Sequence, residues 1–285
     1  MGAAFAVARL LCALGVVTAQ RCPDCRAPMP ASSVMERHLW REVQNILDRT
    51  YDWRYSGYCI GLAEDQVVKD AQAKVAENET ILQAHTYGEV TPNGVRQLAE
   101  FMGLTVASPD AVSFLDLGSG VGKMVLQMYL EVPRVTRSLG VELHPTRAQR
   151  GQEALAMLKQ LGDVRDLRRQ MLQGAVLARR PQAPFAAKLL RNNHLGFIDL
   201  LEADMFDLDL SQFTHIFLAS LTWGTAMINR LAVKLVTEAS RLQVVAALAR
   251  FEGLQGFEEE EQHFQTSWTT KSPTGSRLFV YTRSG

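Results

Sequence analysis

Residues 112–131 read VSFLDLGSGVGKMVLQMYLE, and this stretch decides the fold. The apolar run over 112–117 predicts a buried strand, and the glycines after it predict a tight turn. From Met124 onward, apolar residues recur at helical spacing. Glycines let a ligand approach the backbone closely, and the N–H groups at the start of a helix point toward it. The stretch therefore predicts a strand, turn and helix around a nucleotide-type ligand.

Acidic residues mark the ends of three expected strands. Asp116 stands just before the glycines, Glu142 ends a strand about twenty residues after them, and Asp204 follows a strand over 197–201. A carboxylate at the second strand end suits the two hydroxyls of a ribose. The Asp204-Met205 pair suits a hydrogen bond to adenine and an apolar cover for its ring. NAD enzymes share the first two features, whereas Asp116 and Asp204-Met205 are typical of S-adenosylmethionine sites.

The rest of the chain continues the alternation of helices and strands. We expect a helix over 224–240, a buried strand over 242–248, and an antiparallel pair over 264–270 and 277–282. This order predicts an α/β fold, the Rossmann-like seven-stranded class I methyltransferase sheet, with its cofactor at the carboxyl ends of the strands.

Helical patterns also precede this domain. Residues 33–50 have an amphipathic spacing, and a second helix is expected over 62–84. We therefore divide the chain into a targeting segment over 1–19, an N-terminal helical region over 20–84 and a methyltransferase domain over 85–285.

The text His85-Thr86-Tyr87-Gly88-Glu89, followed later by FLDLGSGVGKMVLQ, resembles the non-SET histone-lysine N-methyltransferases, the disruptor-of-telomeric-silencing family. The similarity extends over roughly residues 80–235, as judged from these motifs. It implies that S-adenosyl-L-methionine is the cofactor and that a Thr-Tyr-Gly-Glu loop closes over it. The acceptor implied by the family is a lysine of a histone in chromatin.

The resemblance also implies which residues form the site. The expected cofactor-binding residues are Thr86, Tyr87, Glu89, Thr91, Asp116, Gly118, Ser119, Gly120, Gly122, Glu142, Asp204 and Met205. The expected catalytic residues are Tyr87, Glu89, Ser220 and Trp223. Two roles stay open for Glu89, which either accepts the lysine proton or binds the ammonium group of the cofactor. No metal site is expected.

The acceptor side departs from the family pattern. Where the family has Val-Asn-Asn-Phe-Ala-Phe-Gly, residues 218–224 read LASLTWG. Ala219 and Ser220 replace the two Asn residues, and Trp223 keeps an aromatic wall. Only the hydroxyls of Ser220 and Thr222 are left to orient a nucleophile. Three functions follow: a histone-lysine methyltransferase, a methyltransferase for another protein or a small molecule, and a non-catalytic binding module.

Charge is balanced overall but uneven along the chain. The 285 residues include 30 basic and 30 acidic ones and are 47% apolar, which excludes disordered and collagen-like proteins. The segment 159–191 holds eight basic and two acidic residues, in an insertion over about 160–195 between the second and third strands. It is a candidate surface for an acidic partner, nucleic acid or an anionic membrane, with a solvated helix face as the alternative. Five acids over 252–261 predict a solvated loop.

The N-terminus resembles a targeting signal. An apolar stretch runs over 3–17, and Val17-Thr18-Ala19 has the small residues of a cleavage site. This predicts secretory or organelle entry, with a buried helix or a membrane anchor as alternatives, whereas a histone role would require the nucleus. Cys22 and Cys25 form a lone pair without further zinc ligands at a suitable spacing, so no catalytic role is expected for them. The sequence does not predict the oligomeric state.

Overall fold

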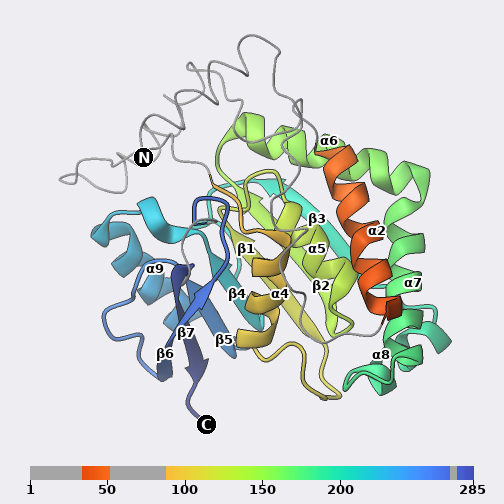
Figure 1. Ribbon diagram of the computed structural model, residues 1–285. Coiled ribbons are helices and arrows are strands. Elements are labelled where there is room, and N and C mark those ends of the chain that lie inside the picture. Colours follow the sequence, from red (N-terminus) through yellow and green to blue (C-terminus); the bar gives the residue numbers. More distant parts are fainter. Residues whose placement is uncertain (1–33, 52–87, 270–274) are drawn as a thin grey trace.

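The computed structural model describes residues 34–51, 88–269 and 275–285, which form one sheet with helices on both faces (Figure 1). Seven strands lie in the order β3-β2-β1-β4-β5-β7-β6, and only β7 runs antiparallel to its neighbours. The strands are β1 (Val112–Leu117), β2 (Val135–Glu142), β3 (Phe197–Glu202), β4 (His215–Leu218), β5 (Val244–Ala247), β6 (Phe257–Phe264) and β7 (Ser276–Arg283). This topology confirms the predicted class I methyltransferase sheet. The segment 1–19, the Cys22–Cys25 pair and the helix expected over 62–84 lie outside the described residues.

Helices connect the strands and cover the sheet. They are α2 (Val34–Thr50), α4 (Pro92–Phe101), α5 (Lys123–Glu131), α6 (Pro145–Leu161), α7 (Asp163–Leu177), α8 (Ala183–Arg191) and α9 (Thr225–Glu238), with a short 3-10 helix, η3 (Ser220–Thr222). The segment over about 160–195, expected as an insertion between the second and third strands, contains α7 and α8. Proline at the start of α8 sets its first turn, where the sequence Ala-Pro-Phe interrupts the basic segment. Within the three described ranges, no helix has the length and apolar character needed to cross a bilayer.

The central strands are buried on both faces. Val112 and Phe114 of β1 pack in a cluster with α4 and α5, whereas Leu115 and Leu117 pack in a second cluster with α9. This alternation follows from the two-residue period of a strand. Parallel strands need helices on both faces of the sheet. The glycine turn therefore lies at the carboxyl end of β1, between the two helical layers.

Helix α2 belongs to the same core as the sheet. It lies beside α7 at one side of the molecule (Figure 1) and also contacts α5. Trp40 of α2 is 5% exposed, and the guanidinium carbons of Arg96 and Arg180 lie 4.2 and 5.6 Å from its ring centre. These contacts combine apolar burial with cation–π attraction. Helix α2 thus packs against the helices that cover the sheet.

The prediction of a solvated loop over 252–261 was wrong. Glu258 to Glu261 form the middle of β6, the edge strand, and they pair with β7 from Thr282 to Phe279. All four glutamates are exposed, so the strand has no buried face in this part. Its backbone pairing with β7 outweighs the low strand propensity of glutamate, and charge on an edge discourages further strand addition. The strand expected over 264–270 was therefore misplaced, because β6 covers Phe257–Phe264 and shares only Phe264 with that range, whereas the strand expected over 277–282 lies within β7.

One member of the basic segment is not on the surface. Arg168 of α7 is 0% exposed, and its two terminal nitrogens donate hydrogen bonds to backbone carbonyls. The acceptors are the carbonyls of Tyr129, Leu130, Val132, Pro133 and Val135. Burial lowers the pKa of Arg168 to about 10, so it stays cationic at neutral pH. The solvated-face interpretation therefore fails for Arg168, which holds the end of α5 against β2.

Candidate active site

The predicted site residues gather at the carboxyl ends of β1, β2 and β3. In the strand order, β1 lies between β2 and β4, so the chain leaves β1 where the direction of strand addition reverses. Ligands of open α/β sheets bind in the crevice at this point. The segment 118–122 turns here from β1 into α5.

Glycines give this turn its shape. Gly118 and Gly122 have φ of 81° and 82°, a left-handed conformation that strongly favours glycine. The amides of Gly118 and Ser119 donate to the carbonyl of Val141 at 2.8 and 3.0 Å, which ties the turn to β2. A Cβ at Gly118 would lie 3.4 Å from Cζ2 of Trp223. The indole therefore stands against the turn, as expected for an aromatic wall beside the site.

Glu142 is fixed at the end of β2. Its two carboxylate oxygens accept hydrogen bonds from the amides of Gly120 and His144, both at 2.8 Å. The residue is 8% exposed. Each oxygen keeps a second lone pair, so the carboxylate can still accept hydroxyl donors. Two backbone bonds thus hold Glu142 in place for a ribose.

Asp116 is buried without a full set of partners. It is 2% exposed, and its Oδ1 makes no hydrogen bond with the described residues. Burial, and secondarily the negative charge of Glu142, raise the pKa of Asp116 to about 8. A buried carboxyl oxygen without a hydrogen-bond partner destabilises the folded state unless a cation or a hydrogen-bond donor binds to it. This orphaned oxygen marks the centre of the site.

The turn after β3 adds a third wall. The amide of Ala203 donates to the carbonyl of Glu142 at 3.1 Å, which places the two strand ends side by side. Asp204 Oδ1 accepts from the amide of Phe206 at 2.9 Å, and Met205 is partly buried against the core. The structure thus brings Asp204 and Met205 to the same edge as Glu142, as the sequence predicted.

Glu89 reaches the site from the segment before α4. Its Oε2 lies 2.8 Å from Nζ of Lys123, at the start of α5. Its amide donates to Oγ of Ser267 at 3.0 Å, and its carbonyl accepts from the amide of Ser267 at 2.8 Å. A Cβ at Gly88 would overlap the ring of Trp268. The segment after β6 therefore holds Glu89 at the glycine turn.

Two predicted residues serve the scaffold instead. Thr91 caps α4: its hydroxyl accepts from the amide of Gly94 at 3.0 Å and donates to the carbonyl of Gln265 at 3.2 Å. Ser220 is 0% exposed, and its hydroxyl accepts from the amide of Ala249 at 2.9 Å and contacts the carbonyl of Leu218 at 3.4 Å. Because both hydroxyls are committed to the backbone, we withdraw Thr91 as a cofactor ligand and Ser220 as a catalytic group. Thr86 and Tyr87 lie outside the described residues.

The sequence analysis missed three residues near Glu89. Lys123 pairs with it, Ser267 holds its backbone, and the buried ring of Tyr51 lies 5.6 Å from the ammonium of Lys123. The position of Lys123, directly after the glycines, was the available signal. Ser267 and Tyr51 carry none, because they meet Glu89 and Lys123 only through the fold.

The glycine turn and its surroundings also match a known family. Residues 66–170 match the model described as "Histone methylation protein DOT1", and this range contains Glu89, Asp116, the glycine turn and Glu142. The chain is an S-adenosylmethionine-dependent methyltransferase, and the match indicates a histone methyltransferase.

The solved structures that are similar to this chain share little sequence with it. An RNA methyltransferase from Salinibacter ruber is 15% identical, with 66% of this chain and 89% of that chain covered and a TM-score of 0.35. The rRNA methyltransferase aviRa from Streptomyces viridochromogenes is 16% identical over 74% and 92%, with a TM-score of 0.41. A methyltransferase from Pyrococcus furiosus is 15% identical over 79% and 100%, with a TM-score of 0.39. No curated protein sequence matched the chain.

The residues of the candidate site fit S-adenosylmethionine. Asp116 offers an unpaired buried oxygen to a cationic ligand, and Glu142 offers a fixed carboxylate to ribose hydroxyls. The ammonium of Lys123, 2.8 Å from Glu89, shows that this carboxylate can hold an ammonium group at the turn. Asp204 and Met205 would hold the adenine. When bound, the cofactor supplies a methyl group on a sulfonium.

Proposed function

We propose that the protein transfers a methyl group to the side-chain amine of a lysine in a histone or another protein. The observation that carries this proposal is the position of Trp223 against the glycine turn, 3.4 Å from where a Gly118 Cβ would lie. Ala219, at the end of β4, also lies near Gly118, at 3.9 Å from the same point. An acceptor that reaches the turn from β4 therefore meets aromatic and apolar side chains.

Such surroundings favour an amine acceptor. A lysine must lose its proton before it attacks, and apolar surroundings lower the pKa of its ammonium group. Bound S-adenosylmethionine would supply the methyl group that the amine nitrogen accepts. Trp223 and the turn would position the amine in line with the methyl group. The ion pair of Glu89 with Lys123 favours a charge-binding role for Glu89 over proton transfer.

One observation favours a protein other than a histone as the acceptor. The hydroxyl of Ser220 is occupied by the amide of Ala249, and Ala219 has no polar group, so neither replaces the family's paired Asn. Ser220 and Thr222 carry the two hydroxyls at the end of β4. Thr222 is partly exposed, and its hydroxyl is the one left to contact an acceptor. A different acceptor would account for this change.

We further propose that the basic segment 159–191 binds an acidic partner, such as an acidic region of the protein substrate. Arg168 is buried and Arg180 is half-buried, so the surface charge comes from the exposed members. These are Lys159, Arg165, Arg169, Arg179, Lys188 and Arg191. Replacing Arg165 and Arg169 by Glu should weaken capture of the substrate and leave cofactor binding unchanged.

Methyl transfer from labelled S-adenosylmethionine tests the function. The full-length chain is incubated with nucleosomes, free histones, whole-cell protein and a small-molecule extract, beside an Asp116→Asn control. Label on lysine of any protein supports the proposal, and label only outside histones supports the other-protein acceptor. Label confined to small molecules, or equal labelling by the Asp116→Asn variant, would contradict it.

A further inference from the structure

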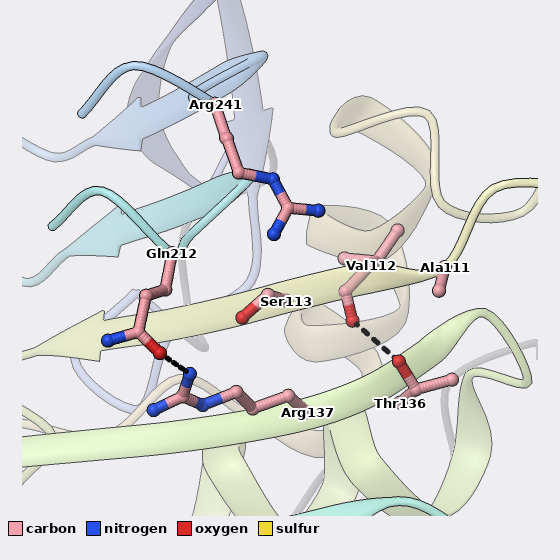
Figure 2. Close-up of a pocket in the computed structure, with 7 residues that line it drawn as sticks. All are labelled: Ala111, Val112, Ser113, Thr136, Arg137, Gln212 and Arg241. Atoms are coloured by element: carbon pink, nitrogen blue, oxygen red, sulfur yellow. Dashed lines mark hydrogen bonds between the residues drawn. The ribbon is translucent and has the colours of Figure 1, made fainter.

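A second hollow lies at the opposite edge of the sheet from the cofactor site. It has a volume of about 220 Å³ and is formed at the amino ends of β1 and β2 and by the turns before β4 and β5. Figure 2 shows Arg241 reaching toward it from one side and Arg137 from the other, with Ser113 between them. Two guanidinium groups and a hydroxyl thus line one small space.

Two buried polar atoms at this hollow have no partner. Ser113 Oγ and Arg137 Nε are shielded from solvent, yet neither makes a hydrogen bond with the described residues. The rest of the Arg137 guanidinium is fixed, because Nη1 donates to Oε1 of Gln212 at 2.5 Å and the group lies 5.0 Å from the ring centre of Phe213. Arg168 also has an unpartnered Nε, but that atom sits in closed packing, whereas Arg137 lines an open hollow.

Positive charge in the hollow is not neutralised. Arg241 is exposed and makes no side-chain hydrogen bond or ion pair with the described residues, and Arg137 has no ion pair among them. The nearby carboxylate of Asp209 accepts from Nε2 of Gln212 at 3.3 Å and from the amide of Ser211 at 2.9 Å. It is fully exposed, so solvent screens its charge.

We propose that this hollow binds one phosphate group, as inorganic phosphate or as a phosphate of a nucleic-acid backbone. Guanidinium groups bind oxyanions through charge-assisted hydrogen bonds. Arg241 and Arg137 approach the hollow from opposite sides, and Ser113 lies between them (Figure 2); a rotation of the Ser113 and Arg137 side chains would bring their shielded Oγ and Nε to the ligand. A tetrahedral phosphate presents oxygens in all three directions, whereas a planar carboxylate presents two in one plane.

This site is separate from the cofactor site. Ser113 is the second residue of β1, and Gly118 directly follows its last residue. Five residues of strand at about 3.3 Å each separate them by about 16 Å. Phosphate should therefore bind without contact with S-adenosylmethionine, and the two affinities can be measured independently.

Calorimetric titration of the full chain tests the site. Inorganic phosphate and a short DNA duplex are titrated at equal ionic strength into the unaltered protein and into the Arg241→Gln and Ser113→Ala variants. Arg41→Gln is the matched control, because Arg41 is an exposed arginine of α2, outside the hollow and outside the basic segment. Cofactor binding by each variant verifies that it is folded.

We expect saturable phosphate binding that Arg241→Gln weakens about tenfold or more and Ser113→Ala weakens about threefold. Arg41→Gln should leave the affinity unchanged. If the duplex binds and loses affinity with Arg241→Gln, a nucleic-acid backbone is the source; if only inorganic phosphate binds, the source is a small molecule. Absence of saturable binding of both probes, or equal affinities for Arg241→Gln and the unaltered chain, would overturn the proposal.

Discussion

Arg168 and Asp116 are two of the buried ionisable side chains of this protein, and their hydrogen bonding is opposite. Arg168 lies under the loop between α5 and β2, where its terminal nitrogens contact five backbone carbonyls. Asp116 lies at the cofactor edge, where its Oδ1 has no partner among the described residues. The pKa of Arg168 stays near 10, so it remains charged, whereas the pKa of Asp116 rises to about 8.

This difference separates a structural charge from a functional one. A buried ion that is hydrogen bonded contributes to the fold, and its removal leaves the surrounding groups unsatisfied. A buried acid without a partner destabilises the free protein and leaves an unmet interaction for a ligand to satisfy. The comparison predicts opposite effects on stability when each is replaced.

The largest effect should follow Arg168→Ala. It leaves buried carbonyls at the end of α5 without donors, so we expect the free energy of unfolding to fall by about 3–5 kcal/mol. Urea denaturation measures it. Arg169→Ala is the control, since Arg169 is exposed and only pairs with Asp166 at 3.4 Å, and it should change stability by less than about 0.5 kcal/mol. Equal effects of the two variants would contradict a structural role for Arg168.

Next in size is the effect of Asp116→Asn on cofactor binding. Loss of a buried carboxylate facing a cationic ligand should weaken S-adenosylmethionine by about 100-fold, or about 3 kcal/mol. Calorimetry checks the affinity, and circular dichroism checks the fold. An unchanged dissociation constant would remove Asp116 from the cofactor site.

The pH dependence of stability sharpens the same contrast. The folded pKa of Asp116 is about 8 against an ordinary value of 3.8, so the folded state binds this proton more tightly. The associated stabilisation is complete below pH 3.8 and is lost as pH rises to about 8. Relative to Asp116→Asn, the unaltered chain should therefore lose stability as the pH rises between these limits. A difference in stability that stays constant with pH would argue against the raised pKa.

The smallest effect should come from Lys123→Gln. The Lys123–Glu89 pair is partly exposed, with side-chain exposures of 28% and 19%, so its loss should cost no more than about 1 kcal/mol of stability. Thermal unfolding without cofactor measures this. A loss as large as that of Arg168→Ala would mean that the pair is a structural element like Arg168.

Much of the fold could be predicted because its signals are local. The run of apolar residues in β1, the glycines after it and the helical spacing of α5 lie within twenty residues of sequence. Glu142 and Asp204 follow from the same pattern of strand and acid. The acidic run over 258–261 misled the prediction, because glutamate favours solvent in any element and the pairing with β7 is a long-range contact.

In the candidate site, too, local sequence patterns predicted some features and long-range packing decided the others. The sequence by itself indicated which groups can meet a nucleotide-type cofactor, namely the glycine turn, Asp116, Glu142 and Asp204, because strand ends of one sheet meet at one edge. Glu89 was expected only from the family resemblance. Only the tertiary structure decided which of the polar groups are left for a ligand. The hydroxyls of Thr91 and Ser220 are taken by backbone groups far along the chain, and Asp116 keeps an unpaired oxygen. Hydrogen-bond partners are set by packing between distant segments, and no local pattern encodes them.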